Sequence, residues 1–254
     1  MDNMKKGFTY LLKKLAAASF AFLIFMLITT IISGFSLFDL SKMLESHWLW
    51  MAFYLYAIIC SIIIDGLHHI FSNKLWMTLI LYSVFGFLPF IFIFIEEIGF
   101  IIIAGVVGAG AALLYYIGWT VATKNKWSTI VFAFVVPILF IFVLNYDFTT
   151  KENWQETYDD NRYEASFSYF SGEHKIPINL EKGDTLSFSI SFNAKNDGGW
   201  GNHFENKRGD YLPMVENGRS LEYDANKSEE YYIVVSGHRV SGSFSVDWDI
   251  VKGN

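Results

Sequence analysis

Charge is scarce in this chain of 254 residues: only 17% of them are Asp, Glu, Lys or Arg, against about 25% in ordinary soluble domains. Cysteine is scarcer still, and the single Cys60 excludes a disulfide-stapled secreted miniprotein. Basic residues do not predominate, since the formal net charge is −6, which excludes a basic nucleic-acid binder. A hydrophobic content of 53% excludes a disordered chain. These absences indicate surroundings in which charge is unfavourable.

The charged residues that are present divide the chain in two. Residues 1–145 carry 8 basic and 6 acidic side chains, while residues 146–254 carry 11 basic and 19 acidic ones. We therefore expect a lipid-embedded domain over 1–145, a spacer over 146–161 and a polar, acidic domain over 162–254.

The first domain contains five apolar runs, each long enough to cross a hydrocarbon core of about 30 Å as a helix. Within lipid the backbone must satisfy its own hydrogen bonds, so helix is the expected structure. The sequence predicts an α-helical polytopic membrane domain with five transmembrane helices, over residues 15–35, 48–64, 75–95, 98–120 and 128–144. Glu96 and Glu97 are expected in a tight turn outside the membrane, because two carboxylates at its centre cost about 5–7 kcal/mol.

Lysine distribution predicts the orientation. With the N-terminus in the cytoplasm, seven lysines fall on the inner side and only Lys42 lies in an outer loop, in keeping with the positive-inside rule. An odd number of spans then places the C-terminal domain outside the cytoplasm. Fifteen Lys against four Arg, with no cysteine in the outer domain, favours the plasma membrane of a Gram-positive bacterium.

Beyond the last span the hydrophobic period changes to two. Leu186, Phe188, Ile190 and Phe192 alternate with serines, which is typical of half-buried antiparallel strands. Seven or eight short strands predict an all-β sandwich or jelly roll as the extracytoplasmic domain. They are expected near residues 163–170, 173–180, 184–193, 211–215, 219–223, 230–236 and 241–250. Before them, the Thr149-x-x-Glu152 pattern predicts a short capped helix through Tyr158.

Three segments of this domain follow a recurring theme. A strand leading to Gly183-Asp184-Thr185 is followed by Tyr231-Tyr-Ile-Val-Val235 and then by Gly242-Ser-Phe244. In this respect the last 90 residues or so resemble the bacterial pre-peptidase C-terminal class of β-sandwich. The resemblance implies an extracellular accessory or binding domain and supplies no catalytic residues.

Asp65, His68 and His69 follow the second apolar run. On a continued helix, residues three and four apart share a face, so Asp65 with either histidine forms a candidate pair of metal ligands. The alternative is an interfacial loop whose polar side chains meet water and headgroups. No charged residue falls in the middle of a predicted span, which argues against a pump with a buried charged relay.

Small residues mark one face of the fourth run: Gly105, Gly108, Ala109 and Ala112. Such faces let helix backbones approach closely, within the bundle or against another membrane protein. Packing within the chain is the favoured use.

The segment Asp197-Gly-Gly-Trp200-Gly-Asn-His203 has three glycines around an aromatic residue. A tryptophan on a mobile loop can stack on a ligand or a partner. The alternative is a hairpin whose tryptophan folds onto the sandwich. Asp197, Trp200 and His203 are accordingly the candidate ligand- or partner-binding residues.

No nucleophile elbow, phosphate-binding glycine loop or His-Glu-x-x-His motif is present, so we expect no enzymatic activity and no cofactor. The leading hypothesis is a membrane-anchored β-sandwich that binds another membrane protein or a cell-envelope ligand, as an accessory subunit of a membrane complex. The alternative is a small-solute transporter or channel, or a bacteriocin-type immunity protein, acting through its helices. The expected surroundings are the lipid bilayer, and no nucleic acid is expected as a partner.

Overall fold

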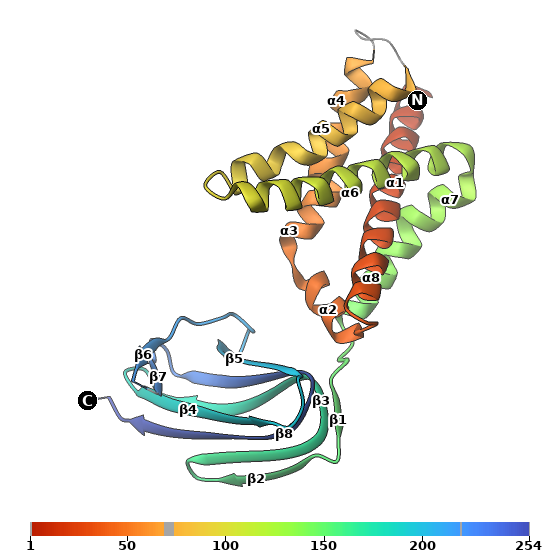
Figure 1. Cartoon of the computed structure of the whole chain (residues 1–254). Coiled ribbons are helices and arrows are strands. Elements are labelled where there is room, and N and C mark those ends of the chain that lie inside the picture. Colours follow the sequence, from red (N-terminus) through yellow and green to blue (C-terminus); the bar gives the residue numbers. More distant parts are fainter. Residues whose placement is uncertain (1, 69–73, 219, 254) are drawn as a thin grey trace. The chain divides into compact units, whose positions relative to one another are not determined.

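The computed structural model describes residues 2–68, 74–218 and 220–253. They form two compact units, Met1–Tyr146, which is helical, and Asp147–Asn254, which is built of strands (Figure 1). Each unit has a hydrophobic core of its own.

The helical unit contains eight α-helices in its described part. Their bounds are α1 Asp2–Ile32, α2 Leu37–Glu45, α3 His47–Trp50, α4 Ala57–Leu67, α5 Leu75–Ile93, α6 Ile98–Lys124, α7 Lys126–Ile130 and α8 Val136–Leu144. Two π-helical segments, Met51–Tyr56 and Val131–Val135, join α3 to α4 and α7 to α8 without a break.

Five helices in this part of the chain are long and apolar enough to cross a membrane, which confirms the predicted number. They are Met4–Ile32, His47–Leu67, Leu75–Ile93, Ile98–Lys124 and Lys126–Leu144. The first begins well before residue 15, because lysines are good helix formers and do not end a helix. The short helix α2 was not predicted; the Ser36 hydroxyl caps it by accepting from the Asp39 amide at 3.1 Å.

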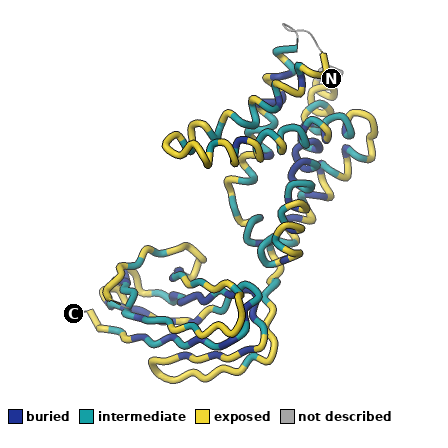
Figure 2. The backbone as a smooth tube through the Cα atoms, in the orientation of Figure 1, coloured by how far each residue is buried: buried dark blue, intermediate teal, exposed yellow. Residues whose placement is uncertain are grey.

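The α5 and α6 helices form a hairpin. The Glu97 amide donates to the Phe94 carbonyl at 2.8 Å in the turn between them, and Glu96 and Glu97 are both exposed there. This is the turn expected from the paired acids. Figure 2 shows that the end of the hairpin is largely exposed. The exposed side chains there include large apolar ones such as Phe92 and Ile103.

The core of the helical unit forms around α1. Ala17, Ala18 and Ala21 are fully buried, and the backbone of α6 approaches α1 at Gly118, where a Cβ would meet Ala17 and Phe20. Small residues that allow such close approach are typical of contacts between membrane helices.

The second unit is an antiparallel β domain, as predicted. In its described residues the strands are β1 Thr150–Glu152, β2 Gln155–Asp159, β3 Arg162–Leu180, β4 Thr185–Ala194, β5 Gly199–Asn206, β6 Val215–Asn217, β7 Ser220–Asp224 and β8 Glu229–Val251. Their order is β1-β3-β8-β4-β7-β6, with β2 also paired to β3 and β5 to β8.

Two strands are much longer than predicted. The expected strands at 163–170 and 173–180 are one strand, β3, and those at 230–236 and 241–250 are one strand, β8. The pairing of β3 with β8 shifts register between Phe167 and Gly172, so both strands bend there without ending. The domain is consequently one sheet that bends back on itself, and not two separate sheets (Figure 1).

The two halves of the bent sheet enclose the core. One half of β8 lies between β3 and β5, and the other half lies between β3 and β4. Phe204 from β5 and Phe188 from β4 are both buried, with ring centres 6.0 Å apart. Contacts of this kind give the two-layer packing expected of a sandwich.

The predicted helix between Thr149 and Tyr158 is wrong. Residues 150–152 and 155–159 are the strands β1 and β2, both paired with β3. The capping pattern is a local preference, and pairing with a strand outweighs it.

Candidate functional site

Lys14 of α1 is sealed inside the helical unit, with no exposed surface. Its Nζ lies 2.7 Å from Asp65 Oδ2 on α4 and donates to Ser61 Oγ at 2.5 Å. The ammonium also lies 3.9 Å from the centre of the Trp119 ring on α6, and the Tyr10 hydroxyl donates to Asp65 Oδ2 at 2.6 Å. A buried ammonium requires such partners because removing an unpaired charge from water costs several kcal/mol.

Further hydroxyl groups extend this network. The Tyr82 hydroxyl of α5 lies 2.8 Å from Ser61 Oγ, and the Tyr115 hydroxyl of α6 donates to the backbone carbonyl of Lys14 at 3.1 Å. Polar contacts therefore join α1, α4, α5 and α6 at one end of the bundle.

Helical spacing places these side chains together. Residues four apart share a helix face, and each of the four helices contributes such a pair: Tyr10 and Lys14, Ser61 and Asp65, Thr78 and Tyr82, Tyr115 and Trp119. This four-residue spacing is the sequence signal from which the polar cluster could have been predicted.

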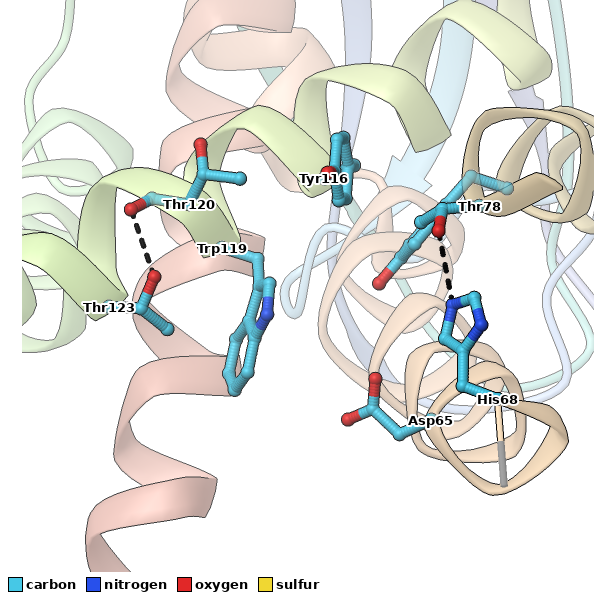
Figure 3. A pocket seen from close by; sticks show the side chains of 8 residues that line it. Asp65, His68, Thr78, Tyr116, Trp119, Thr120 and Thr123 are labelled. Atoms are coloured by element: carbon cyan, nitrogen blue, oxygen red, sulfur yellow. Dashed lines mark hydrogen bonds between the residues drawn. The ribbon is translucent and has the colours of Figure 1, made fainter. Parts of the chain in front are cut away.

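A cavity of about 460 Å³ opens beside the network (Figure 3). The lining side chains are polar or aromatic and come from α4 with its C-cap, α5 and α6: Asp65, His68, Thr78, Tyr82, Tyr116, Trp119, Thr120 and Thr123. Figure 3 shows Asp65 and His68 facing the same space as Trp119 and Thr78.

His68 has one satisfied ring nitrogen and one unsatisfied one. Its Nε2 lies 3.2 Å from the Thr78 hydroxyl, which itself donates to the Lys74 carbonyl at 3.3 Å. Which of the two groups donates depends on the tautomer of the imidazole ring. Among the described residues nothing bonds the buried Nδ1.

The candidate metal ligands are only partly brought together. Asp65 and His68 line one cavity, and His69 lies outside the described residues. Within the described ranges, no three His, Cys, Asp or Glu side chains are grouped closely enough to hold a metal ion. Asp65 is not in a loop, as the alternative assumed; it is part of α4 and is paired with Lys14.

The first helix extends beyond the predicted run 15–35, so the candidate span Met4–Ile32 includes Lys14, which the sequence prediction places on the cytoplasmic side. Its partner Asp65 is distant in sequence, and only the packing of α1 on α4 brings the two together.

The small residues of α6 lie against α5. A Cβ at Gly105 would meet the Phe87 ring, and one at Gly108 would meet the Phe90 ring. On the facing helix, a Cβ at Gly86 would meet Ala109 and Ala112. The structure thus places this face in packing within the chain.

In the β domain, the candidate binding residues are separated. Trp200 and His203 belong to β5, where the regular pairing with β8 directs them to opposite faces. Trp200 stacks on Phe192 of β4, with ring centres 4.8 Å apart, and His203 Nε2 lies 3.4 Å from the buried Glu205 carboxylate. Asp197 is exposed in the bend before β5. These three residues do not form one site.

A second polar cluster, which the sequence did not suggest, lies at the start of the β domain. Lys151 donates to His174 Nδ1 at 2.7 Å, and Glu156 accepts from the Tyr163 hydroxyl at 2.6 Å and from Trp154 Nε1 at 2.7 Å. Burial, helped by the Lys151 charge, lowers the pKa of His174 to about 4. The bonds from Tyr163 and Trp154 lower the pKa of Glu156.

Known proteins show little similarity to this chain. No family model matches the chain, and no curated protein matches it. Among solved structures, a chain from "Crystal structure of accessory secretory protein 1,2 and 3 in Streptococcus pneumoniae" shares 9% sequence identity with a TM-score of 0.25. The match covers 39% of this chain and 90% of that one.

Proposed function

We propose that this protein is a non-enzymatic, multi-pass protein of a bacterial plasma membrane that binds a partner through its β domain, outside the cytoplasm. Its role is that of an accessory subunit of a membrane complex. The resemblance to the pre-peptidase C-terminal class points to the same role.

One observation carries this proposal: most of the outer edge of β5 is unpaired among the described residues, and its first half carries no charged side chains. Within the described residues, the outer edge pairs only near Phe204 and Asn206, with the segment around Leu212. The preceding residues 199–203 contain no Asp, Glu, Lys or Arg. Sheet edges usually carry charges that prevent further pairing, as β2 does with Glu156 and Asp159.

An extended segment of a partner protein fits such an edge. Main-chain hydrogen bonds supply affinity when a strand is added to a sheet. Trp200, still 47% exposed after stacking on Phe192, supplies an aromatic contact beside the edge. The excess of acidic residues in this domain favours a partner segment flanked by Lys or Arg.

The test is purification of the full chain from native membranes in mild detergent, followed by identification of co-eluting proteins. Since Leu212 N–H bonds to the Phe204 carbonyl at the outer edge, alternation directs the Asn202 amide outward as well. Asn202→Pro therefore removes an outward donor and keeps the bonds to β8. We expect a stoichiometric membrane partner that Asn202→Pro and Trp200→Ala both lose.

Tyr158→Ala is the matched control, because Tyr158 is an exposed aromatic residue on the charged strand β2. It should retain the partner. A homogeneous protein with no partner, or a partner that a folded Asn202→Pro variant retains, contradicts the proposal.

A second function, in which the helices act on a small solute, is favoured by the cavity beside Asp65 and by the buried Lys14. Ionisable groups inside a membrane domain most often serve solute or ion pathways. Flux through proteoliposomes that contain the purified chain tests this function.

A further inference from the structure

Two strands of the β domain have unpaired edges on the same side of the sandwich. Strand β3 takes one edge of β8, and the other edge of β8 pairs first with β5 and then with β4. The outer edge of β4 is covered by β7 only at Thr185–Phe188, and the segment around Leu212 covers that of β5 only near its end. In the described part of the chain, residues 189–194 and 199–203 therefore have no strand beside their outer edges.

The register places these two free edges in facing layers at the same end of the sandwich. The last residue of β4 pairs with Gly242 of β8, and the first residue of β5 pairs with His238, so both free stretches lie beside the bend of β8. Trp200 of β5 stacks on Phe192 of β4, with ring centres 4.8 Å apart and ring planes 6° apart. One aromatic contact between the layers therefore lies between the two free edges.

The side chains along these edges favour a further strand. Residues 189–194 and 199–203 contain no Asp, Glu, Lys or Arg, the side chains that usually prevent pairing at an exposed edge. Ile190 and Phe192 pack against the core but are only partly buried, and Trp200 is 47% exposed. Apolar side chains of an added strand would complete the burial of these three residues, which is favourable.

On the outer face of β5, two glycines leave room for a large side chain of a neighbouring strand. Gly199 and Gly201 alternate with Trp200 and therefore point away from the core. A Cβ at Gly199 would meet only His238, at 3.8 Å, and one at Gly201 would meet only Ser236 Oγ, at 3.2 Å. An aromatic side chain on an adjacent strand can cover an edge glycine of this kind.

We infer that the partner segment bound at β5 alternates apolar side chains with an aromatic one. The apolar side chains lie between the layers beside Phe192 and Trp200, and the aromatic one lies over Gly201. The outward main-chain groups of Trp200 and Asn202 pair with the segment, and a polypeptide backbone supplies donors and acceptors at the matching spacing. The inference rests on partner binding by the β domain, as proposed above, and adds the sequence pattern of the segment that is bound.

Fluorescence anisotropy of labelled peptides, with the full chain in phosphatidylcholine nanodiscs, tests the inference. The probe is Lys-Lys-Thr-Val-Tyr-Val-Thr-Lys-Lys, whose valines face the core when its tyrosine lies over Gly201. N-Methylation of both valines removes the donors to β5 and should abolish binding. Threonine in place of both valines should weaken binding at least tenfold, and alanine in place of the tyrosine should weaken it about threefold.

Two results overturn the inference: no binding of the probe, and equal binding of the N-methylated peptide. The proposed function has a separate readout, the native partner that co-purifies with the full chain. If that partner is captured and Asn202→Pro loses it while the probe does not bind, the inference fails and the proposed function stands.

Variants locate the site. Asn202→Pro and Trp200→Ala should lose the probe, and Ile190→Thr, which makes the facing layer more polar, should weaken its binding several-fold. Val251→Thr is the matched control, because Val251 is an exposed aliphatic residue at the far end of β8, and it should bind normally. Unchanged affinity in a folded Asn202→Pro variant overturns the assignment. Binding of chitotriose in place of the peptide would assign Trp200 to a glycan, and a dimer that Asn202→Pro dissociates would assign the edge to a second copy of this chain; either result also overturns it.

Discussion

The two units of this protein differ in the side chains that they leave exposed. In the helical unit, Lys14 and Ser61 are fully buried, while Ile103 and Phe142 are among many large apolar side chains left exposed. In the β domain, Phe204 and other aromatic and aliphatic side chains are fully buried, most charged side chains are exposed, and Asp184 and Glu205 are buried. The β domain exposes mainly polar side chains, and the apolar surface of the helical unit is compatible with a helical membrane part.

This difference shows what holds each unit together. The β domain gains its stability from burying apolar surface, at roughly 25 cal/mol per Å². The helical unit gains little in that way if its surroundings are as apolar as its own side chains. The helical unit is instead stabilised by close backbone approach at glycine and alanine and by polar bonds such as those of Lys14. Variants that remove these contacts test the comparison.

The largest effect is expected from Asp65→Asn. It leaves the Lys14 ammonium sealed without a counter-charge, which costs about 3–5 kcal/mol when a buried pair is broken. The double variant Lys14→Met, Asp65→Asn should recover most of this loss, because no buried charge remains. The measurement is the free energy of unfolding in mixed micelles.

The Asp184–Lys252 pair of the β domain is the matched control, with Nζ and Oδ2 2.9 Å apart and Lys252 65% exposed. Lys252→Met should cost much less than Asp65→Asn, because the Lys252 ammonium is exposed and the Asp184 carboxylate keeps its bonds from the Glu181 and Gly253 amides. Equal losses for Asp65→Asn and Lys252→Met would refute the contrast between the units.

A smaller effect is expected from Gly86→Val in α5. The new side chain would meet the Gly108 carbonyl and Ala112 of α6, and overpacking of this kind costs about 1–3 kcal/mol. Gly110→Val is the control, because a Cβ at Gly110 meets nothing within 4 Å. Thermal unfolding of both variants in detergent is the measurement, and equal melting temperatures would show that close approach of α5 and α6 does not stabilise the unit.

Sequence reasoning succeeded where a local pattern decides the structure. Apolar length gave the five helices, the paired acids Glu96 and Glu97 gave the α5–α6 turn, and period-two alternation gave the strands β4 and β8. It failed where distant residues decide. The Thr149-x-x-Glu152 pattern predicted a helix, but pairing with β3 makes this segment β1.

The site in the helical unit was only half predicted, for the same reason. Asp65 and His68 were recognised as a pair, since both lie near the end of one helix. Lys14 and Trp119 were missed as their neighbours, because α1 and α6 contribute them from distant parts of the sequence. In the β domain, Trp200 and His203 were grouped by their closeness in sequence, whereas a strand directs them to opposite faces.

The smallest effect is a pH dependence confined to the β domain, at His174. Its pKa is lowered to about 4, mainly by burial and also by the charge of Lys151, against about 6.5 in an unfolded chain. Between these values the unfolded chain binds a proton that the folded domain does not bind, so stability is lost as the pH falls from about 6.5 to 4.

Because the ring is partly exposed, we expect a loss on the order of 1–2 kcal/mol, seen as a fall of several degrees in the melting temperature of the β domain between pH 7 and pH 4.5. His174→Gln should flatten the profile over this range. The lowered pKa of Glu156 acts in the same direction but only below about pH 4.5, where unfolded carboxylates begin to titrate. If the melting temperature of the His174→Gln variant still falls with pH as steeply as before, other groups cause the acid sensitivity. The comparison between the two units would then depend only on the stability measurements for Asp65→Asn and Gly86→Val.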